Sequence, residues 1–221
     1  MNAAPFVPER PTLSSLRRTM QDCRGCPLYR RATQAVPGAG KRESRILLVG
    51  EQPGNDEDLT GKPFVGPAGR MLDEGLEAAG IDRSAAFVTN AVKHFKWMAV
   101  EGKRLHKKPS AREVSACRPW LTAEISVVHP DVIVALGATA AQSIFGRAFR
   151  VTRDHGVPVD TTLAPHAIAT IHPAAILRQR SAADRERERA AFIADLTIAA
   201  RLLRSATTDA RRQTATERGR G

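Results

Sequence analysis

The stretch RILLVGEQPG, residues 45–54, joins a short apolar run to a loop rich in glycine and proline. An apolar run of this length that ends in glycine is typical of a buried β-strand. Residues 66–80, GPAGRMLDEGLEAAG, follow with apolar side chains at helical spacing and a closing glycine, which predicts a helix. Together they predict a strand, a loop and a helix, the repeating unit of a parallel sheet.

The rest of the chain repeats this alternation. Apolar runs predict further strands over residues 85–92, 131–137 and 166–173. Ser110, with Glu113 three residues later, is a capping signal that opens a helix over residues 110–128, and helical spacing returns over 138–146 and 184–204. We therefore expect an α/β fold, a three-layer α/β/α sandwich around a mostly parallel four-stranded sheet.

Length and charge limit the domain organisation and the partners. The chain has 221 residues, which suits one α/β core, and we expect a single domain over residues 12–204 after a flexible N-terminal segment of residues 1–11. Polar composition predicts a disordered basic tail over residues 205–221. Lys and Arg number 34 against 23 Asp and Glu, and a net charge of +11 favours nucleic acid as the partner.

Two apolar signals are missing from the sequence. No apolar stretch is long enough to span a bilayer, and the N-terminus lacks the apolar centre of a signal peptide. We therefore expect a soluble, cytoplasmic protein with no membrane partner.

The three cysteines, Cys23, Cys26 and Cys117, are an odd number, which argues against a secreted disulfide framework. Cys23 and Cys26 form a C-x-x-C pair, a spacing that serves zinc and iron–sulfur sites. A redox pair or two incidental buried thiols remain alternatives. The pair precedes the first strand, and this position weakens the redox interpretation.

Unusual residues stand at the ends of three predicted strands. The first strand runs into GEQPG (50–54), the second into TNAVKH (89–94) and the fourth into HPAAILR (172–178). Ligands of parallel α/β sheets bind beyond the carboxyl ends of the strands, so we expect these segments to meet in one cleft. Each also has a plainer interpretation, as an ordinary turn, a strand-ending asparagine or a structural histidine.

These segments, in this order, resemble the uracil-DNA glycosylase superfamily. GEQPG, then GKPFVGPAGRMLD (61–73), TNAVKH and HPAAILR, with CRGCPLY (23–29) before them, are similar to the iron–sulfur family 4 enzymes. An inserted basic segment, GKRLHKKPSAREVSACRPWL (102–121), resembles that of the UdgX-type members. The resemblance covers roughly residues 12–204 and implies the glycosylase fold, base flipping and a role in DNA repair.

The resemblance assigns roles at the base. Phe64 is expected to stack on the flipped uracil, and the Asn90 amide suits the N3–H and O4 edge of that base. His172 is expected to donate to uracil O2 as the base leaves, and Gln52 to hold the base through its backbone or amide. Without the resemblance, Phe64 reads as a core aromatic and Asn90 as a turn or cap.

The resemblance also implies contacts with the rest of the DNA. Leu177 and Arg178 are candidates for the wedge that fills the vacated stack and for a phosphate contact, although an exposed helix start is the plainer alternative. Cationic side chains in the inserted segment are expected to hold phosphates; they are Lys103, Arg104, Lys107 and Lys108. The expected partner is uracil-containing DNA, single- or double-stranded, bound by a monomer.

A [4Fe–4S] cluster is the cofactor that the resemblance implies. Three of the family's four cysteine ligands match Cys23, Cys26 and Cys117, and His94 stands where the fourth is expected. Imidazole ligates iron in Rieske centres, so a cluster with three cysteines and one histidine is the preferred expectation. Zinc is the alternative, since the same four groups make an ordinary structural zinc site.

His106 is the one good nucleophile in the basic segment. By resemblance it attacks the sugar carbon that loses uracil, so that the protein stays covalently bound to DNA, with Glu51 as the partner of the other ring nitrogen. Three functions remain: a single-turnover glycosylase trapped on its product, an ordinary multiple-turnover uracil-DNA glycosylase, and a non-enzymatic DNA-binding module held by a metal. In the last two, His106 is only another DNA contact.

Overall fold

The computed structural model describes residues 1–218, with side-chain environments over residues 1–206. Its strands are β1 Ile46–Gly50, β2 Ala86–Asn90, β3 Trp97–Val100, β4 Lys103–His106, β5 Val132–Leu136 and β6 His166–Thr170. Its α-helices are α1 Leu13–Thr19, α2 Asn55–Thr60, α3 Pro67–Ala78, α4 Ala111–Val128, α5 Ala138–Phe145, α6 Val151–Asp154, α7 Pro173–Leu177 and α8 Ala182–Arg218. Short 3-10 turns are η1 Ala4–Phe6, η2 Met20–Asp22, η3 Pro27–Arg30 and η4 Arg83–Ala85.

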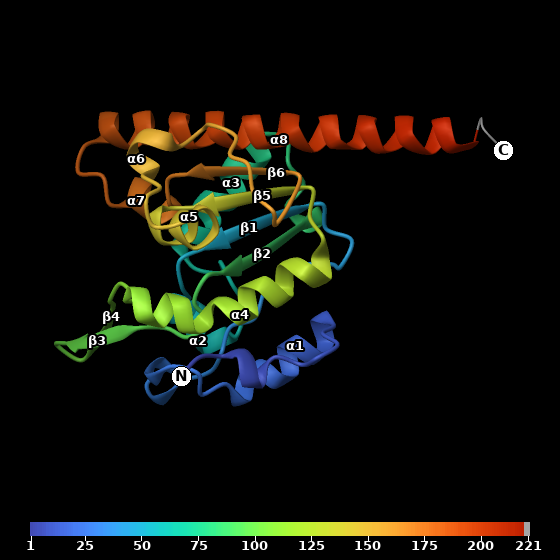
Figure 1. Cartoon of the computed structure of the whole chain (residues 1–221). Coiled ribbons are helices and arrows are strands. Elements are labelled where there is room, and N and C mark those ends of the chain that lie inside the picture. The colour runs from blue at the N-terminus through green and yellow to red at the C-terminus, as the bar shows by residue number, and fades with distance from the viewer. Residues whose placement is uncertain (219–221) are drawn as a thin grey trace.

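A four-stranded parallel sheet in the order β2-β1-β5-β6 forms the middle layer (Figure 1). Every residue of β1 is buried, because helices cover both faces of the sheet. Ile46 and Leu48 point toward α3, α7 and α8, whereas Leu47 and Val49 point toward α4 and α5. The α/β/α sandwich and its four-stranded parallel sheet are confirmed.

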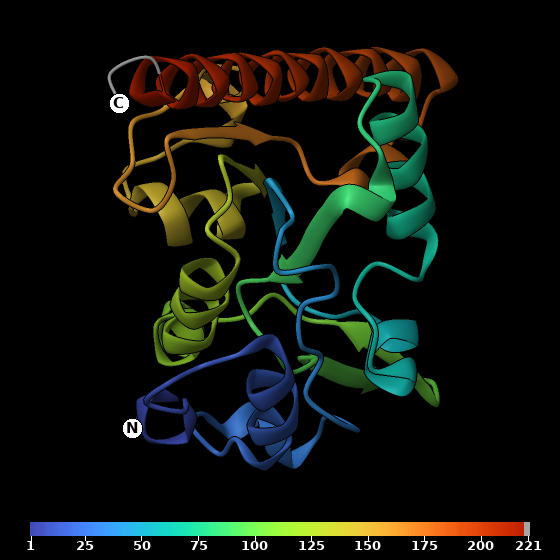
Figure 2. The ribbon, with the colours of Figure 1, turned by 90° about the vertical axis from the view of Figure 1, so that its right-hand side faces the viewer.

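The N-terminal segment packs against the outer side of α4, at the opposite end of the molecule from α8 (Figure 2). Ala3 is buried and its N–H donates to the carbonyl of Ala116 at 2.8 Å. These contacts anchor part of the segment that the sequence predicts to be flexible. Residues 207–218 have no described side-chain environment and residues 219–221 lie outside the described residues, so the disordered tail over 205–221 stays a prediction.

The inserted basic segment begins in an antiparallel hairpin of β3 and β4, for which the sequence predicts no strands. Its cross-strand pairs include Trp97 with His106 and Met98 with Leu105. Ser110 and Glu113 form the predicted capping box, which starts α4 directly after the hairpin. Among the described helices, none is both long enough and apolar enough to cross a membrane.

Candidate active site

The carboxyl ends of all four parallel strands meet at one edge of the sheet, on the left in Figure 1. Gly50 pairs in register with Asn90, and the amide of Ala91 donates to the carbonyl of Gly50 at 2.9 Å. On the other side, the amide of Gly137 donates to the carbonyl of Thr170 at 2.8 Å. The three segments that the sequence predicts to converge therefore do so, and the end of β5 joins them.

Gly50 lets two of the predicted uracil-binding side chains approach the end of β1. A Cβ atom there would lie 2.3 Å from Oδ1 of Asn90 and 2.6 Å from Cζ of Phe64. Real Cβ atoms do not come this close to their neighbours, so only glycine fits between the two side chains. Phe64 has a positive φ of 57°, a rare conformation for a bulky residue. This turn brings the ring next to Asn90.

Asn90 is 2% exposed. Within the described residues its side-chain amide forms no hydrogen bond, and neither amide atom is among the fully buried atoms that lack a partner, so the amide reaches accessible space. Its backbone, in contrast, is held firmly: the buried ammonium of Lys93 donates to the Asn90 carbonyl at 2.8 Å and to Glu124 Oε2 at 2.6 Å. The arrangement fixes the main chain of Asn90 and leaves its amide free for a ligand.

His172 caps the start of α7, and its Nδ1 accepts from the amide of Ala174 at 3.1 Å. The ring proton is therefore on Nε2, which is left as a donor. Burial lowers the pKa of His172 to about 4, and the nearby charges of Arg178 and His106 act in the same direction. The ring also stacks with Phe64, with centroids 6.1 Å apart. At neutral pH, His172 is thus an uncharged donor beside the Phe64 ring.

Glu51 connects the end of β1 to β4. Its Oε1 lies 3.5 Å from Nε2 of His106, and its Oε2 accepts from the hydroxyl of Thr139 at the start of α5. The hydroxyl fixes one carboxylate oxygen and leaves the other facing the imidazole. His106 is therefore next to a carboxylate that is already oriented, as the sequence predicts for this pair.

The environment of His106 keeps its imidazole uncharged. Burial lowers the pKa of His106 most, the Glu51 carboxylate raises it in part, and the positive charge of Arg178 lowers it again. Even so, 49% of the side chain is exposed, so the ring is open to a ligand. A neutral imidazole has a free lone pair on one nitrogen, which is what a nucleophile requires.

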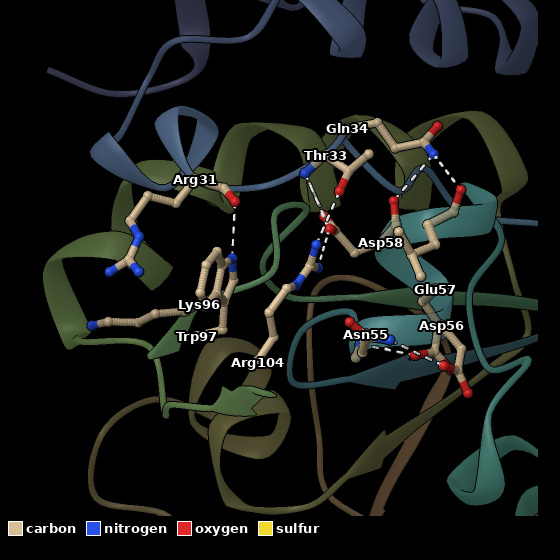
Figure 3. A network of polar contacts seen from close by, with 12 residues as sticks. Arg31, Thr33, Gln34, Asn55, Asp56, Glu57, Asp58, Lys96, Trp97 and Arg104 are labelled. Atoms are coloured by element: carbon tan, nitrogen blue, oxygen red, sulfur yellow. Dashed lines mark hydrogen bonds and ion pairs between the residues drawn. The ribbon is translucent and has the colours of Figure 1, made fainter. Parts of the chain in front are cut away.

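Arg104, two residues before His106, turns inward (Figure 3). Its guanidinium forms an ion pair with the fully buried carboxylate of Asp58 and donates to the hydroxyl of Thr33 at 3.2 Å. It also lies over the rings of Phe95 and Trp97, at 5.2 and 5.1 Å from their centroids. This corrects the predicted phosphate contact, because Asp58 already pairs with the charge.

Two further contacts hold the hairpin in place. Trp97, the cross-strand partner of His106, donates from Nε1 to the carbonyl of Arg31 at 2.8 Å (Figure 3). The side chain of Gln52 spans the hairpin base, where its Nε2 donates to the carbonyls of Lys96 and Lys107 at 3.2 Å. Its Oε1 accepts from the Lys96 amide, so the side-chain amide of Gln52 is engaged with the hairpin, and a hold on the base through the Gln52 backbone stays a prediction.

Most of the other predicted DNA contacts are at the surface around this edge. The exposed residues are Lys103, Lys107, Lys108, Leu177 and Arg178. Leu177, at the end of α7, is 38% exposed although it is a large apolar residue. This position is compatible with the predicted wedge.

The three predicted cysteine ligands gather between the N-terminal segment and α4, in a buried cluster that does not include His94. Cys23 and Cys117 belong to one buried cluster, with Cys26 packed against it. The amide of Lys93 donates to Cys117 Sγ at 3.3 Å, and Trp120 Nε1 donates to Cys23 Sγ at 3.2 Å.

The titration of these groups also reflects burial. Burial raises the pKa of Cys117 to about 12 and lowers that of His94 to about 4. His94 is therefore neutral, with a lone pair that suits ligation. Within the described residues, however, no three His, Cys, Asp or Glu side chains are grouped closely enough for a single metal ion.

Four residues that hold this site are missing from the sequence interpretation. Thr139 orients Glu51, Asp58 pairs with Arg104, Gly50 admits Asn90 and Phe64, and Lys93 holds the Asn90 backbone. Only Thr139 had a usable signal, since it follows the third predicted strand and strand ends converge. Asp58 and Gly50 act through contacts between distant parts of the chain, and Lys93 reaches Asn90, three residues earlier, from a position that no sequence pattern marks.

Comparisons with known proteins agree with this geometry. A family model described as the uracil DNA glycosylase superfamily matches residues 37–197. The chain is 40% identical to the type-4 uracil-DNA glycosylase of Thermotoga maritima, over 73% of this chain and 81% of the relative. It is 36% identical to the type-4 enzyme of Archaeoglobus fulgidus (75% and 83% covered) and 30% identical to the type-5 enzyme of Thermus thermophilus (67% and 72%).

Proposed function

The chain belongs to the uracil-DNA glycosylase superfamily, and on this basis we propose that it excises uracil from DNA. The observation that carries the proposal is the meeting of Asn90, Phe64 and His172 around the ends of the parallel strands. These three supply an unpartnered amide, an aromatic face and a neutral donor. A flipped uracil needs all three kinds of contact.

Recognition follows from the groups that each side chain presents. The Asn90 amide offers a donor for O4 and an acceptor for N3–H, whereas cytosine presents the opposite pattern there. Phe64 provides the stacking surface, worth about 1–3 kcal/mol for one base. The pocket therefore rejects cytosine because it would leave buried polar groups unpaired.

Excision breaks the bond between C1′ of the sugar and N1 of uracil, and both electrons leave with the base. Negative charge then develops on the base, including O2, where the Nε2–H of His172 would donate. His172 is suited to this because its pKa of about 4 keeps it neutral and its Nδ1 already accepts from Ala174. The departing uracil finally takes up a proton and leaves as the neutral base.

We further propose that His106 captures the sugar. The lone pair of one imidazole nitrogen forms a bond to C1′ as the bond to uracil breaks, and the other ring nitrogen donates its proton toward Glu51. Support comes from the 3.5 Å separation of these two side chains and from the Thr139 hydroxyl that orients the carboxylate. A nitrogen held in place outcompetes water through its effective molarity.

The alternative is ordinary turnover, in which water attacks C1′ and Glu51 positions it. Similarity to relatives named type-4 uracil-DNA glycosylases favours this reading. A uracil-containing oligonucleotide incubated with the protein and run on a denaturing gel separates the two functions. Covalent capture gives a band that survives SDS and heat, and turnover gives strand breaks after alkali. If neither product forms, the glycosylase proposal is overturned.

We also propose that Cys23, Cys26, Cys117 and His94 hold a [4Fe–4S] cluster, with zinc as the alternative. The buried cluster shared by the three cysteines, the two N–H donors aimed at sulfur and the neutral His94 support it. The cluster would tie the N-terminal segment to β2 and α4, with no redox step in the reaction. Stoichiometric iron and a visible absorption band that bleaches on reduction are expected, and a colourless zinc protein would overturn the cluster.

A further inference from the structure

A cleft of about 510 Å³ lies between α4 and α5, beside residues of the candidate active site. Figures 1 and 2 both show these two helices side by side on the same face of the sheet. Small and apolar residues such as Ala91 and Leu121 line the cleft, together with polar side chains such as Ser115 and Gln142. Its volume falls within the range of about 300–1,000 Å³ that is usual for ligand sites.

Three cationic side chains line this cleft: Lys108, Arg118 and Arg147. All three are exposed, and among residues 1–206 none of their charged groups forms an ion pair or a hydrogen bond. Arg104, in contrast, forms an ion pair with the buried carboxylate of Asp58. Three unpaired cations around one hollow produce a positive potential that attracts an anion.

The cleft borders residues of the candidate active site. Thr139, whose hydroxyl orients Glu51, lines it, and so does Ala91, which follows Asn90. Lys108 comes two residues after His106. A uridine within DNA is attached to a nucleotide on each side, so the strand must leave the site past residues such as these, with its phosphates exposed to them.

We propose that this cleft holds a phosphodiester of the DNA strand next to the flipped nucleotide, with Lys108, Arg118 and Arg147 as its contacts. The inference rests on the proposed function and extends it from the base to the strand. Among the described residues that line the cleft none is aromatic, so it offers no stacking surface for a base. Phosphate contacts of this kind position the strand and do not read its sequence.

Binding to an oligonucleotide with one unreactive uridine analogue, 2′-fluorinated at the sugar, tests the proposal without chemistry. Each phosphate near the uridine is replaced in turn by a neutral methylphosphonate. For the wild-type protein one replacement is expected to weaken binding by about tenfold, the scale of a charged hydrogen bond. For Arg118→Gln/Arg147→Gln the same replacement should cost clearly less than for the wild type, because only Lys108 still contacts this phosphate. The slope of log affinity against log salt should fall by about 0.7 per lost contact.

Arg201→Gln is the matched control, since it removes one exposed charge on α8, away from the cleft. It should bind like the wild type at every phosphate position. Equal methylphosphonate losses in the double variant and the wild type would overturn the proposal. The proposal would also be overturned if inorganic phosphate abolished the difference between these two proteins at every phosphate position alike. That result would mark a site for free anions. Uracil release, measured separately on ordinary uracil DNA, reports on the proposed function alone.

Discussion

Oε1 of Glu51 lies 3.5 Å from Nε2 of His106, and the other carboxylate oxygen accepts from the hydroxyl of Thr139. The two residues are far apart in sequence, on the loop after β1 and at the end of β4. Their separation depends on how the hairpin docks and on how Thr139 turns the carboxylate. Both conditions can be tested by substitution.

Glu51→Gln is expected to slow formation of the covalent complex by roughly 10²-fold, the lower end of the range for general acid–base groups. An amide keeps the size of the side chain but loses the negative charge that stabilises the imidazolium. Single-turnover crosslinking rates check this. Thr139→Val should slow the reaction less, and Thr139→Ser is the control that keeps the hydroxyl. If Glu51→Gln crosslinks at the wild-type rate, Glu51 is not the partner of the His106 ring.

The pH dependence of crosslinking should follow the lowered pKa of His106. Only the neutral ring is a nucleophile, and burial together with Arg178 keeps its pKa below the ordinary 6.5. The rate is therefore expected to fall as the pH drops below 6.5, at a midpoint lower than that of an ordinary imidazole. Arg178→Gln removes a nearby positive charge, so the midpoint should move upward. A downward shift or none would contradict this electrostatic account.

Asn90→Asp should reduce the preference for uracil over cytosine. The new carboxylate repels O4 of uracil and accepts from the cytosine amino group, so the change removes one favourable contact and adds one for the competitor. Excision from matched uracil and cytosine oligonucleotides measures the ratio. If the preference is unchanged, Asn90 has a structural role, which its buried position at the end of β2 would also permit.

Arg104→Met should destabilise the protein by ~3 kcal/mol, because it leaves the carboxylate of Asp58 buried without its partner. Denaturant unfolding measures this loss. The double variant Arg104→Met/Asp58→Asn should regain much of the stability, yet it should still crosslink more slowly than it releases uracil, because the anchor of the His106 strand is gone. If the double variant recovers the wild-type crosslinking rate together with its stability, the ion pair of Arg104 and Asp58 has only a structural role.

The sheet could be predicted because its signal is local. Residues 45–50, 131–137 and 166–173 are apolar runs buried on both faces, and the strands observed at Ile46–Gly50, Val132–Leu136 and His166–Thr170 lie within them. The capping box of Ser110 and Glu113 is local in the same way. Such elements are specified by neighbouring residues, so the sequence alone indicates them.

The hairpin could not be predicted on the same grounds. Residues 97–106 are mostly exposed and rich in cations, without the alternation of apolar and polar residues that marks a half-buried strand. In an extended strand, Arg104 and His106 lie on one face and Lys103 and Leu105 on the other. Arg104 thus turns toward Asp58, a partner 46 residues earlier that no local pattern reveals.

The most direct test of covalent capture is the intact mass of the protein after incubation with a uracil-containing oligonucleotide. We predict a species equal to protein plus oligonucleotide minus one uracil, with the modified peptide containing His106, and none with thymine DNA. His106→Ser should lose this species and still release uracil, because the groups that expel the base remain. An unmodified wild-type protein beside released uracil, or a His106→Ser protein that still carries the DNA, would show that His106 does not capture the sugar.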